Sequence, residues 1–247
     1  MIVNRILKVL LLLLAGILIV LQGLALEAEG TVLGTIMLVL LSVLYNRITQ
    51  DKSIYFQAFL VLFTIGHLFS SLGWYGPMIK EGGIDYYYYG ANILYITSYL
   101  MFVLKIIKSI NFREAYRDLA IPVVILLVLD VFCVIIVSDT TRGTLSFYEY
   151  ILEFVYNSVI MLLLSLALIN YLYRNDKKSM LFLIGSICIV FSEIIQLAYY
   201  YIIDDNYLGF VYSFFLVMAF IFFYLKSQAK YTGPQPSYLD MDERLGA

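Results

Sequence analysis

The chain is divided into eight apolar stretches, each about 20 residues long and separated by short polar segments. A helix of about 20 apolar residues is long enough to cross the hydrocarbon core of a bilayer. Within lipid every backbone amide and carbonyl must find a hydrogen-bond partner, and a helix supplies these partners internally. The sequence therefore predicts an all-α, polytopic transmembrane helical bundle. The expected spans are residues 6–26, 31–47, 54–74, 87–107, 119–138, 148–172, 180–202 and 207–226.

Composition supports this class and excludes others. Hydrophobic residues make up 62% of the chain and charged residues 14%, which is well below the charged share of a soluble domain. The net charge of −2, with basic residues scattered among span ends, gives no signal for nucleic-acid binding. Cys133 and Cys188 lie inside spans, away from any His or Cys cluster, so neither a metal nor a disulfide is expected. No glycine-rich phosphate loop or CxxC pair is present in the sequence, so no cofactor is expected.

Basic residues are distributed unevenly between the two sides of the predicted bundle. Of the 16 Lys and Arg residues, only Lys80 and Arg142 fall on the side opposite the N-terminus. The positive-inside rule therefore predicts that both termini are cytoplasmic, in the inner membrane if the source is bacterial. The first span is expected to be retained, because its apolar run is longer than that of a signal peptide. Residues 1–230 would form the transmembrane domain, and residues 231–247 a disordered cytoplasmic tail.

The other side is rich in acidic and aromatic residues, including the runs Tyr86–Tyr89 and Tyr199–Tyr201. Two interpretations are open: an interfacial aromatic belt, or a vestibule lined by tyrosine. The loop from Tyr75 to Asp85 is the longest on this side and would cover such a vestibule. A 4+4 internal repeat is also suggested, because the third and seventh spans both carry a Phe-Ser pair and both lead into a Tyr-rich turn.

Three polar side chains stand out inside the apolar spans: His67, Asp130 and Glu193. Counted at about 1.5 Å per residue from the cytoplasmic charges, each lies roughly 20 Å into its span. A carboxylate at this depth is costly unless it faces the bundle interior or a water-filled cavity. We therefore expect all three residues to converge on one polar cavity as catalytic groups. His67, the sole histidine, has a second interpretation as a hydrogen-bonded core residue.

Neutral polar and aromatic residues at similar depth are candidate substrate-binding residues. Ser192 and Gln196 lie on one stripe of the same helix as Glu193, and Trp74 ends the third span. The full set is Asn92, Asn157, Gln196, Trp74 and Ser192. Asn92 and Asn157 have the alternative role of bridging neighbouring helices. Glu153 lies one turn outward of Asn157 on the same helix face, near the membrane surface. It has a bland interpretation as a charge solvated at that surface.

The third and fourth spans, LFSSLGW followed by YYYYGANILYITSYLMFVLK, resemble the paired motif of lysoplasmalogenase-like membrane proteins. In that family a Ser-Leu-Leu-Gly-Asp helix end precedes a Phe-x-x-Gly helix start. The seventh span, ICIVFSEIIQLAYY, is similar to the family's Phe-x-x-Ser-Asp helix, with Glu193 in place of the Asp. This chain departs from the pattern at Gly73-Trp74, where the family has Gly-Asp, and near Ser98, where the family has a His.

The resemblance implies about eight spans with both termini on one side. It also implies hydrolysis of the vinyl-ether bond of lysoplasmalogens, which releases an aldehyde and a glycerophospho-head group. The partner would then be a lipid or another amphiphilic molecule within the membrane.

Two classes of function follow from these residues. A membrane lipid hydrolase would need an acid and a base, and Glu193 and Asp130 would divide these roles with His67 nearby. A non-catalytic protein, such as a proton-linked transporter, a small-ligand sensor or a partner subunit, would use the same carboxylates to hold protons or ligands. A catalytically inactive family member follows if Trp74 fills the cavity. The sequence leaves the oligomeric state open.

Overall fold

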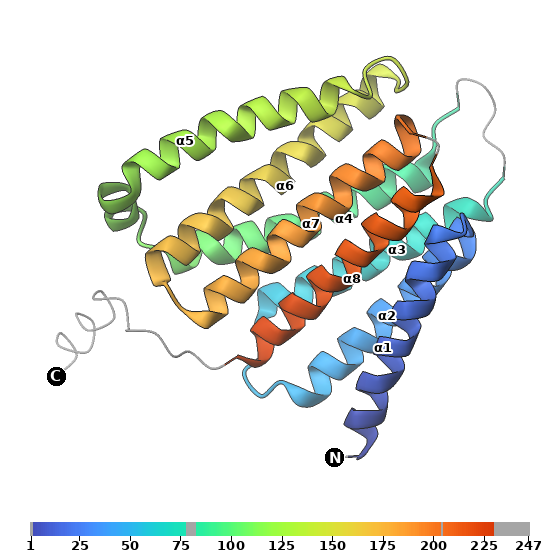
Figure 1. Cartoon of the computed structure of the whole chain (residues 1–247), viewed down its shortest axis with the longest axis horizontal. Helices are drawn as coiled ribbons and strands as arrows, with labels where there is room; N and C mark the ends of the chain where they lie inside the picture. The colour runs from blue at the N-terminus through green and yellow to red at the C-terminus, as the bar shows by residue number, and fades with distance from the viewer. Residues whose placement is uncertain (1, 78–82, 204, 230–247) are drawn as a thin grey trace.

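The computed structural model describes residues 2–77, 83–203 and 205–229, and these residues form eight α-helices and no strand. The helices are α1 (Ile2–Gly23), α2 (Glu27–Ile48), α3 (Ile54–Trp74), α4 (Tyr86–Ser109), α5 (Phe112–Asp139), α6 (Phe147–Arg174), α7 (Lys177–Tyr201) and α8 (Asn206–Gln228) (Figure 1). Each contains a stretch long and apolar enough to cross a membrane. The prediction of an all-α, multi-pass membrane protein is confirmed. The predicted tail 231–247 lies outside the described residues, as does part of the Tyr75–Asp85 loop.

The first helix ends three residues earlier than predicted. The chain turns at Ala25, which has a φ of 56° in the left-handed region, and α2 then begins at Glu27. Glu27 and Glu29 lie in the first turn of α2, where the partial positive charge of a helix N-terminus stabilises them. Apolar Leu24 and Leu26 occupy this turn, so hydropathy alone extended the first span too far.

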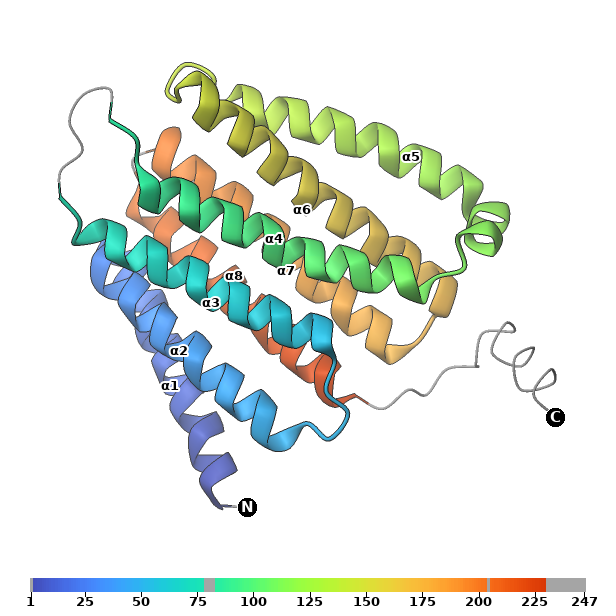
Figure 2. The same ribbon diagram turned by 180° about the vertical axis from the view of Figure 1, so that it is seen from behind.

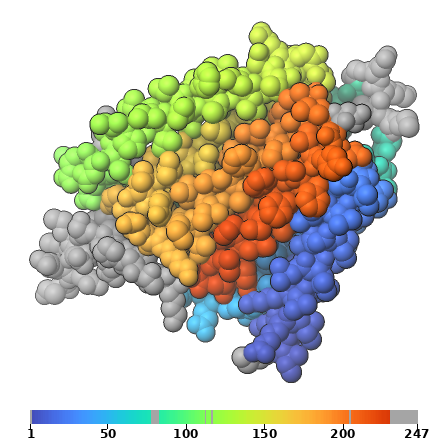
Figure 3. All heavy atoms as spheres, in the orientation of Figure 1, coloured from blue at the N-terminus to red at the C-terminus, as the bar shows by residue number. Residues whose placement is uncertain are grey.

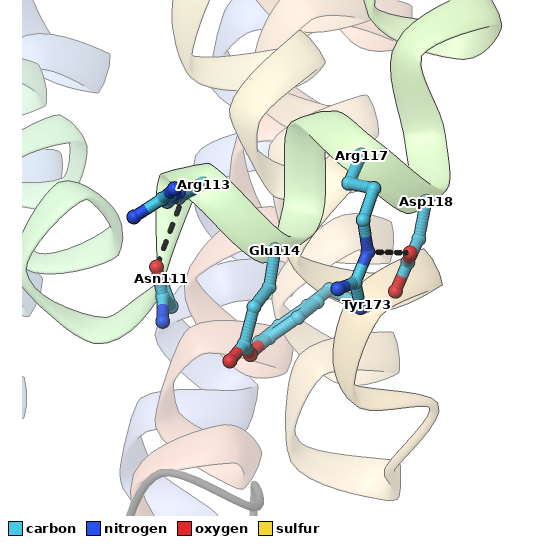
Figure 4. A network of polar contacts seen from close by, with 6 residues as sticks. All are labelled: Asn111, Arg113, Glu114, Arg117, Asp118 and Tyr173. Carbon is cyan, nitrogen blue, oxygen red and sulfur yellow. Dashed lines mark hydrogen bonds and ion pairs between the residues drawn. The ribbon is translucent and has the colours of Figure 1, made fainter.

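The fifth helix begins seven residues earlier than predicted and is broken near its start. Asn111 caps it by accepting a hydrogen bond from the backbone N–H of Arg113 at 3.3 Å (Figure 4). Leu119 leaves the helical region, with φ −123° and ψ 24°. The break follows from Pro122, which lacks an N–H and whose ring clashes with the carbonyl four residues before it. The membrane-spanning part, Arg117–Asp139, lies almost entirely beyond this break.

Seven helices close into a ring, in which each packs against the next in the order α1, α2, α3, α4, α6, α7 and α8, with α8 returning to α1. Helix α5 lies outside the ring and packs principally on α6 (Figures 1 and 2). Consecutive helices pair in the same way in both halves of the chain, as a 4+4 repeat requires. The repeat itself stays a prediction.

The two most extensively packed helix pairs are α7 with α8 and α3 with α4. Aromatic rings fill the space between them, and the rings of Phe59 and Phe102 stack with centroids 4.1 Å apart. Glycine permits the closest approaches: a Cβ on Gly209 would lie 2.3 Å from the carbonyl oxygen of Gln22, and one on Gly185 would lie 2.6 Å from the Phe223 ring. The space-filling view shows α6, α7, α8 and α1 abutting along one face (Figure 3).

Two ends of the bundle are distinguished below. The basic face is the end at which α1 begins and α8 ends, and it carries Lys8, Lys105, Arg174 and Lys226. The opposite face is the end at which α3 and α7 end and α4 begins, and it carries Trp74, Asp85 and Tyr201. Which face is cytoplasmic stays a prediction from the charge distribution.

Candidate functional site

A two-lobed cavity lies toward the opposite face, inside the helix ring. Its outer lobe has a volume of about 380 Å³ and is lined by α3, α4, α6 and α7. Its inner lobe, about 80 Å³, continues deeper between these helices and α1, α2 and α8. Six residues line both lobes, so the lobes are parts of one cavity. They are Ser70, Tyr95, Tyr156, Glu193, Gln196 and Tyr200.

Glu193 lies at the junction of the two lobes. The phenol of Tyr99 on α4 donates a hydrogen bond to its Oε1 at 2.5 Å. The phenol of Tyr156 on α6 also hydrogen-bonds to this carboxyl group. Two phenols from different helices therefore fix the orientation of Glu193 within the cavity. Such short bonds to an ionised oxygen are among the stronger hydrogen bonds in proteins.

A second carboxyl group, that of Glu153, faces the same outer lobe. Its side chain is 9% exposed, and its Oε1 accepts a hydrogen bond of 3.3 Å from Nδ2 of Asn157 one turn along α6. Its charge and that of Glu193 act on each other. Nδ2 of Asn157 also contacts Oγ of Ser138 at 3.2 Å, which ties α6 to α5. The cavity thus brings together two carboxyl groups whose partners are neutral.

The lining of the cavity has a definite chemical character. Besides Glu153 and Glu193, it includes Asp85, which caps α4 by accepting a hydrogen bond from the Tyr88 N–H at 2.9 Å. The aromatic residues that line the outer lobe are Trp74, Tyr87, Tyr88, Tyr95, Tyr156, Tyr200 and Tyr201. Among the described residues, which leave out 78–82, no Lys or Arg lines either lobe. Carboxylates combined with aromatic faces attract cations, and alkylammonium groups in particular.

An apolar groove of about 290 Å³ adjoins the inner lobe. It runs along α1, α2, α3 and α8 toward the basic face, where the Nζ of Lys8 lies 5.7 Å from the centre of the Tyr224 ring. The groove and the inner lobe share Leu18, His67 and Leu216 as lining residues. The outer lobe, the inner lobe and the groove are therefore in series.

His67 stands between the groove and the cavity. It interacts with the backbone of Thr31, and its Nδ1 is buried without a hydrogen-bond partner. Room for the ring comes from Gly34, since a Cβ there would lie 2.9 Å from Cε1 of His67. His67 and Glu193 both line the inner lobe, so the structure brings these two of the three predicted catalytic residues to one cavity, and their catalytic role stays a prediction.

Asp130 lies elsewhere. It belongs to α5, outside the ring, and its carboxylate accepts a hydrogen bond from Oγ of Ser165 on α6 at 2.8 Å. It is absent from the linings of both lobes. The expected convergence of Asp130 with His67 and Glu193 is therefore wrong. The physical reason is that α5 packs on the outer side of α6, so Asp130 points toward α6 and is separated from the cavity by that helix.

The predicted binding residues divide in the same way. Asn92, Asn157, Gln196 and Trp74 all line the outer lobe. Ser192 does not, because its hydroxyl donates to the backbone carbonyl of Tyr212 at 2.9 Å and ties α7 to α8. Trp74 is 48% exposed and lies at the rim, and a volume of about 380 Å³ is open beside it, so it does not fill the cavity.

Sequence reasoning missed several residues of the cavity. The sequence pattern does not identify Tyr99 and Tyr156 as the hydrogen-bond partners of Glu193. It also does not place Glu153 among the expected site residues. A usable signal was present: Asn92, Tyr95 and Tyr99 lie three and four residues apart on α4, as do Glu153, Tyr156 and Asn157 on α6. Two polar stripes on neighbouring helices indicate a shared interior.

Among the described residues, no group of three or more His, Cys, Asp or Glu side chains is arranged to hold a metal ion. Comparison of the chain with protein-family models, with curated proteins and with solved structures finds no match. The functional argument therefore rests on the cavity and the groove.

Proposed function

We propose that this multi-pass membrane protein binds a single-chain amphiphile with an ammonium head group and hydrolyses its vinyl-ether bond. The observation that carries the proposal is the pair of carboxyl groups, Glu153 and Glu193, in a cavity whose described lining is rich in aromatic rings and contains no Lys or Arg. The resemblance to lysoplasmalogenase-like proteins points to the same substrate class.

The cavity suits the head group. An ammonium ion is attracted by the faces of aromatic rings and by carboxylates, and the outer lobe supplies seven aromatic residues and three acids. Lysoplasmalogens carry choline or ethanolamine, both of which present such an ion. Asp85 and Trp74, near the ends of α4 and α3, lie where a head group would enter from the opposite face.

The groove suits the hydrocarbon chain. Its lining is apolar apart from Lys8, His67 and Tyr224, and it meets the inner lobe at His67. An amphiphile with its polar end in the outer lobe would extend its chain through the inner lobe into the groove. The reacting bond would then lie near Glu193, at the junction of the lobes.

The two carboxyl groups suit the chemistry. Vinyl-ether hydrolysis begins with transfer of a proton to the vinyl carbon farther from the ether oxygen, which leaves positive charge shared between the other vinyl carbon and that oxygen. Water then adds to that carbon, and the resulting hemiacetal breaks down to an aldehyde and an alcohol. We assign the role of proton donor to Glu153. We assign to Glu193 the role of the carboxylate that stabilises the cation and accepts a proton from water, because two phenols stabilise the negative charge of Glu193.

The decisive experiment is incubation of the purified full-length protein with a choline lysoplasmalogen, with released aldehyde as the measurement. The matched control substrate is the alkyl-ether lysolipid of equal chain length, which lacks the double bond that accepts the proton. Aldehyde should form from the first substrate only. The hydrolase proposal is overturned if the wild-type protein releases aldehyde no faster than the Glu153→Gln, Glu193→Gln double variant.

A second candidate is proton-linked transport of a small cationic ligand without catalysis. The specific observation in its favour is that outer lobe, inner lobe and groove are in series from the opposite face toward the basic face, with His67 between them. Titratable residues along such a path are typical of proton relays. Ligand-driven acidification of liposomes that contain the protein, without aldehyde release, would favour this candidate over the hydrolase.

A further inference from the structure

Four basic side chains from four helices meet at the basic face. They are Lys105 of α4, Arg174 at the end of α6, Lys178 in the first turn of α7 and Lys226 of α8. The charges of the other three act on Lys226, and those of Lys178 and Arg174 also act on Lys105. Like charges in close proximity repel, so this basic cluster destabilises the folded chain unless a negative group joins it.

Lys226 is the buried member of the basic cluster. Its side chain is 8% exposed, and its Nζ lies 3.8 Å from the centre of the Phe182 ring and 5.6 Å from that of Phe102. Lysines near the end of a membrane helix usually extend toward water and head groups. Lys226 instead points into the aromatic core. Ring faces carry no net charge, so they supply no anion beside the buried Lys226 side chain.

Lys105 and Lys226 also hydrogen-bond to each other. The other contacts of the basic cluster are with neutral groups. The Nζ of Lys105 donates to Oγ of Ser53 at 3.0 Å. The Nη2 of Arg174 donates to the backbone carbonyl of Ser109 at 2.7 Å. Within the described ranges, the only ion pairs are Arg117 with Asp118 and Arg142 with Asp139, and neither includes a member of the cluster.

Acidic residues close to the cluster in sequence have other partners. Asp176 is buried and accepts a hydrogen bond of 2.6 Å from the backbone N–H of Ser179 as the N-cap of α7. Glu114 of α5 accepts a hydrogen bond of 2.9 Å from the phenol of Tyr173, and Figure 4 shows the two side chains lying together. The four basic side chains therefore lack a carboxylate partner within the described part of the chain.

We propose that the basic cluster binds the phosphate group of an anionic ligand, either the head group of a lipid in the adjoining leaflet or a soluble phosphate compound. Phosphate presents several oxygen acceptors and one or two negative charges, which suits one guanidinium and three ammonium groups. Basic pockets between helix ends at a membrane surface are typical sites for anionic head groups. The proposal is independent of the proposed hydrolase, since no member of the cluster lines the cavity or the groove.

The test is thermal unfolding of the purified full-length protein in a neutral detergent. Phosphatidylglycerol in mixed micelles probes the lipid source, with phosphatidylcholine as its control. Inorganic pyrophosphate probes the soluble source, with sodium chloride at equal ionic strength as its control. Ligand at a hundredfold excess over its Kd should raise Tm by about 5 °C or more, because binding to the folded state alone stabilises it.

Variants locate the effect. Lys226→Met should abolish the ligand-dependent rise in Tm, whereas Lys177→Met should retain it, because Lys177 is exposed and lies outside the cluster. If Lys226→Met does not fold, the double variant Lys105→Gln, Lys178→Gln replaces it and should lose most of the rise. A rise with phosphatidylglycerol alone assigns a lipid head group, and one with pyrophosphate alone assigns a soluble ligand. The proposal is overturned if neither ligand shifts the wild-type Tm, or if the cluster variant tested keeps the full shift.

Discussion

At the opposite face, Glu193 and Glu153 are held by phenol and amide donors, whereas at the basic face Lys226 and Lys105 are held by aromatic rings and a hydroxyl group. Each end therefore concentrates one sign of charge and satisfies it with neutral partners. The aromatic core of Phe59, Phe102 and Phe223 lies between the two ends. Charges that are not paired within the protein remain available to a ligand of opposite sign.

The two ends differ in openness. The opposite face leads into a cavity of about 380 Å³. At the basic face the side chain of Lys226 is buried, with 8% of its surface exposed. A cavity can enclose a substrate and exclude bulk water from it, as acid–base catalysis on a lipid requires. A cluster near the membrane surface can hold a head group without enclosing it. The difference separates a proposed reaction site from a proposed anchoring site.

The largest effect is expected for a change of Glu193 in the cavity near the opposite face. Glu193→Gln keeps the size of the side chain and removes its titratable proton, so turnover should fall by about a hundredfold or more. Folding should hold, because Gln retains a carbonyl that accepts from Tyr99 and Tyr156. The matched control is Asp130→Asn, an intramembrane acid bonded to Ser165 outside the cavity, which should keep turnover within about threefold of wild type. Aldehyde release and Tm measured on the same preparations check both, and the opposite order of effects would restore Asp130 as the reacting acid.

The next effect concerns the neutral donors that hold the acid. Tyr99→Phe removes the phenol that donates to Glu193 at 2.5 Å and leaves a buried acceptor short of a partner. The free energy of unfolding should fall by about 1–3 kcal/mol. Tyr75→Phe is the control, because Tyr75 is 67% exposed and its hydroxyl can be replaced by water. Equal stability of the two variants in thermal unfolding would show that the Tyr99 bond contributes little.

A smaller effect is expected for the aromatic support of the basic end. A double-mutant cycle of Lys226→Met with Phe182→Leu measures the coupling between the ammonium and the ring, which lie 3.8 Å apart. We expect a coupling of about 0.5–2 kcal/mol, the range of buried cation–π contacts. The single variant Lys226→Met should itself be as stable as wild type or more so in the absence of ligand, because Met packs against the rings without the cost of burying a polar amine. Unfolding of all four proteins supplies the coupling, and a value of zero would mean that the ring only fills space.

The smallest effect concerns the passage between cavity and groove. Gly34→Ala places a methyl group 2.9 Å from Cε1 of His67, so the imidazole must shift where the groove meets the inner lobe. Long-chain substrates should lose a few-fold in kcat/KM relative to short-chain ones, a scale set by small steric changes in apolar pockets. Gly16→Ala is the control, since a Cβ there meets nothing within 4 Å. The same chain-length profile in both variants would exclude the groove as the binding site of the chain.

Hydropathy predicted the number and order of the helices because each span must satisfy its backbone within lipid. It did not predict which helix stands outside the ring, since any apolar helix is compatible with either position. Asp130 shows the consequence: residue counting groups its depth with that of Glu193, yet depth carries no information on the direction of the side chain. The span from Arg117 to Asp139 is the most apolar of the eight, and this was the available sign that α5 faces lipid. For Glu193 the flanking Gly185, Ser192 and Gln196 indicated an interior face, and Gln196 does line the cavity with it.

The contact between α1 and α8 has a consequence for the order of events during synthesis. The ring closes where Gly209 meets the backbone of Gln22 and where the Tyr212 phenol donates to the Gln22 side chain at 2.7 Å. These groups belong to α1 and α8, so the ribosome must have made α8 before they can meet. Until then Gln22, and later Ser192 on α7, lie in the membrane without α8 as their partner. A nascent chain stalled before residue 206 would present these polar groups to lipid and to the chaperones and proteases that survey unassembled helices.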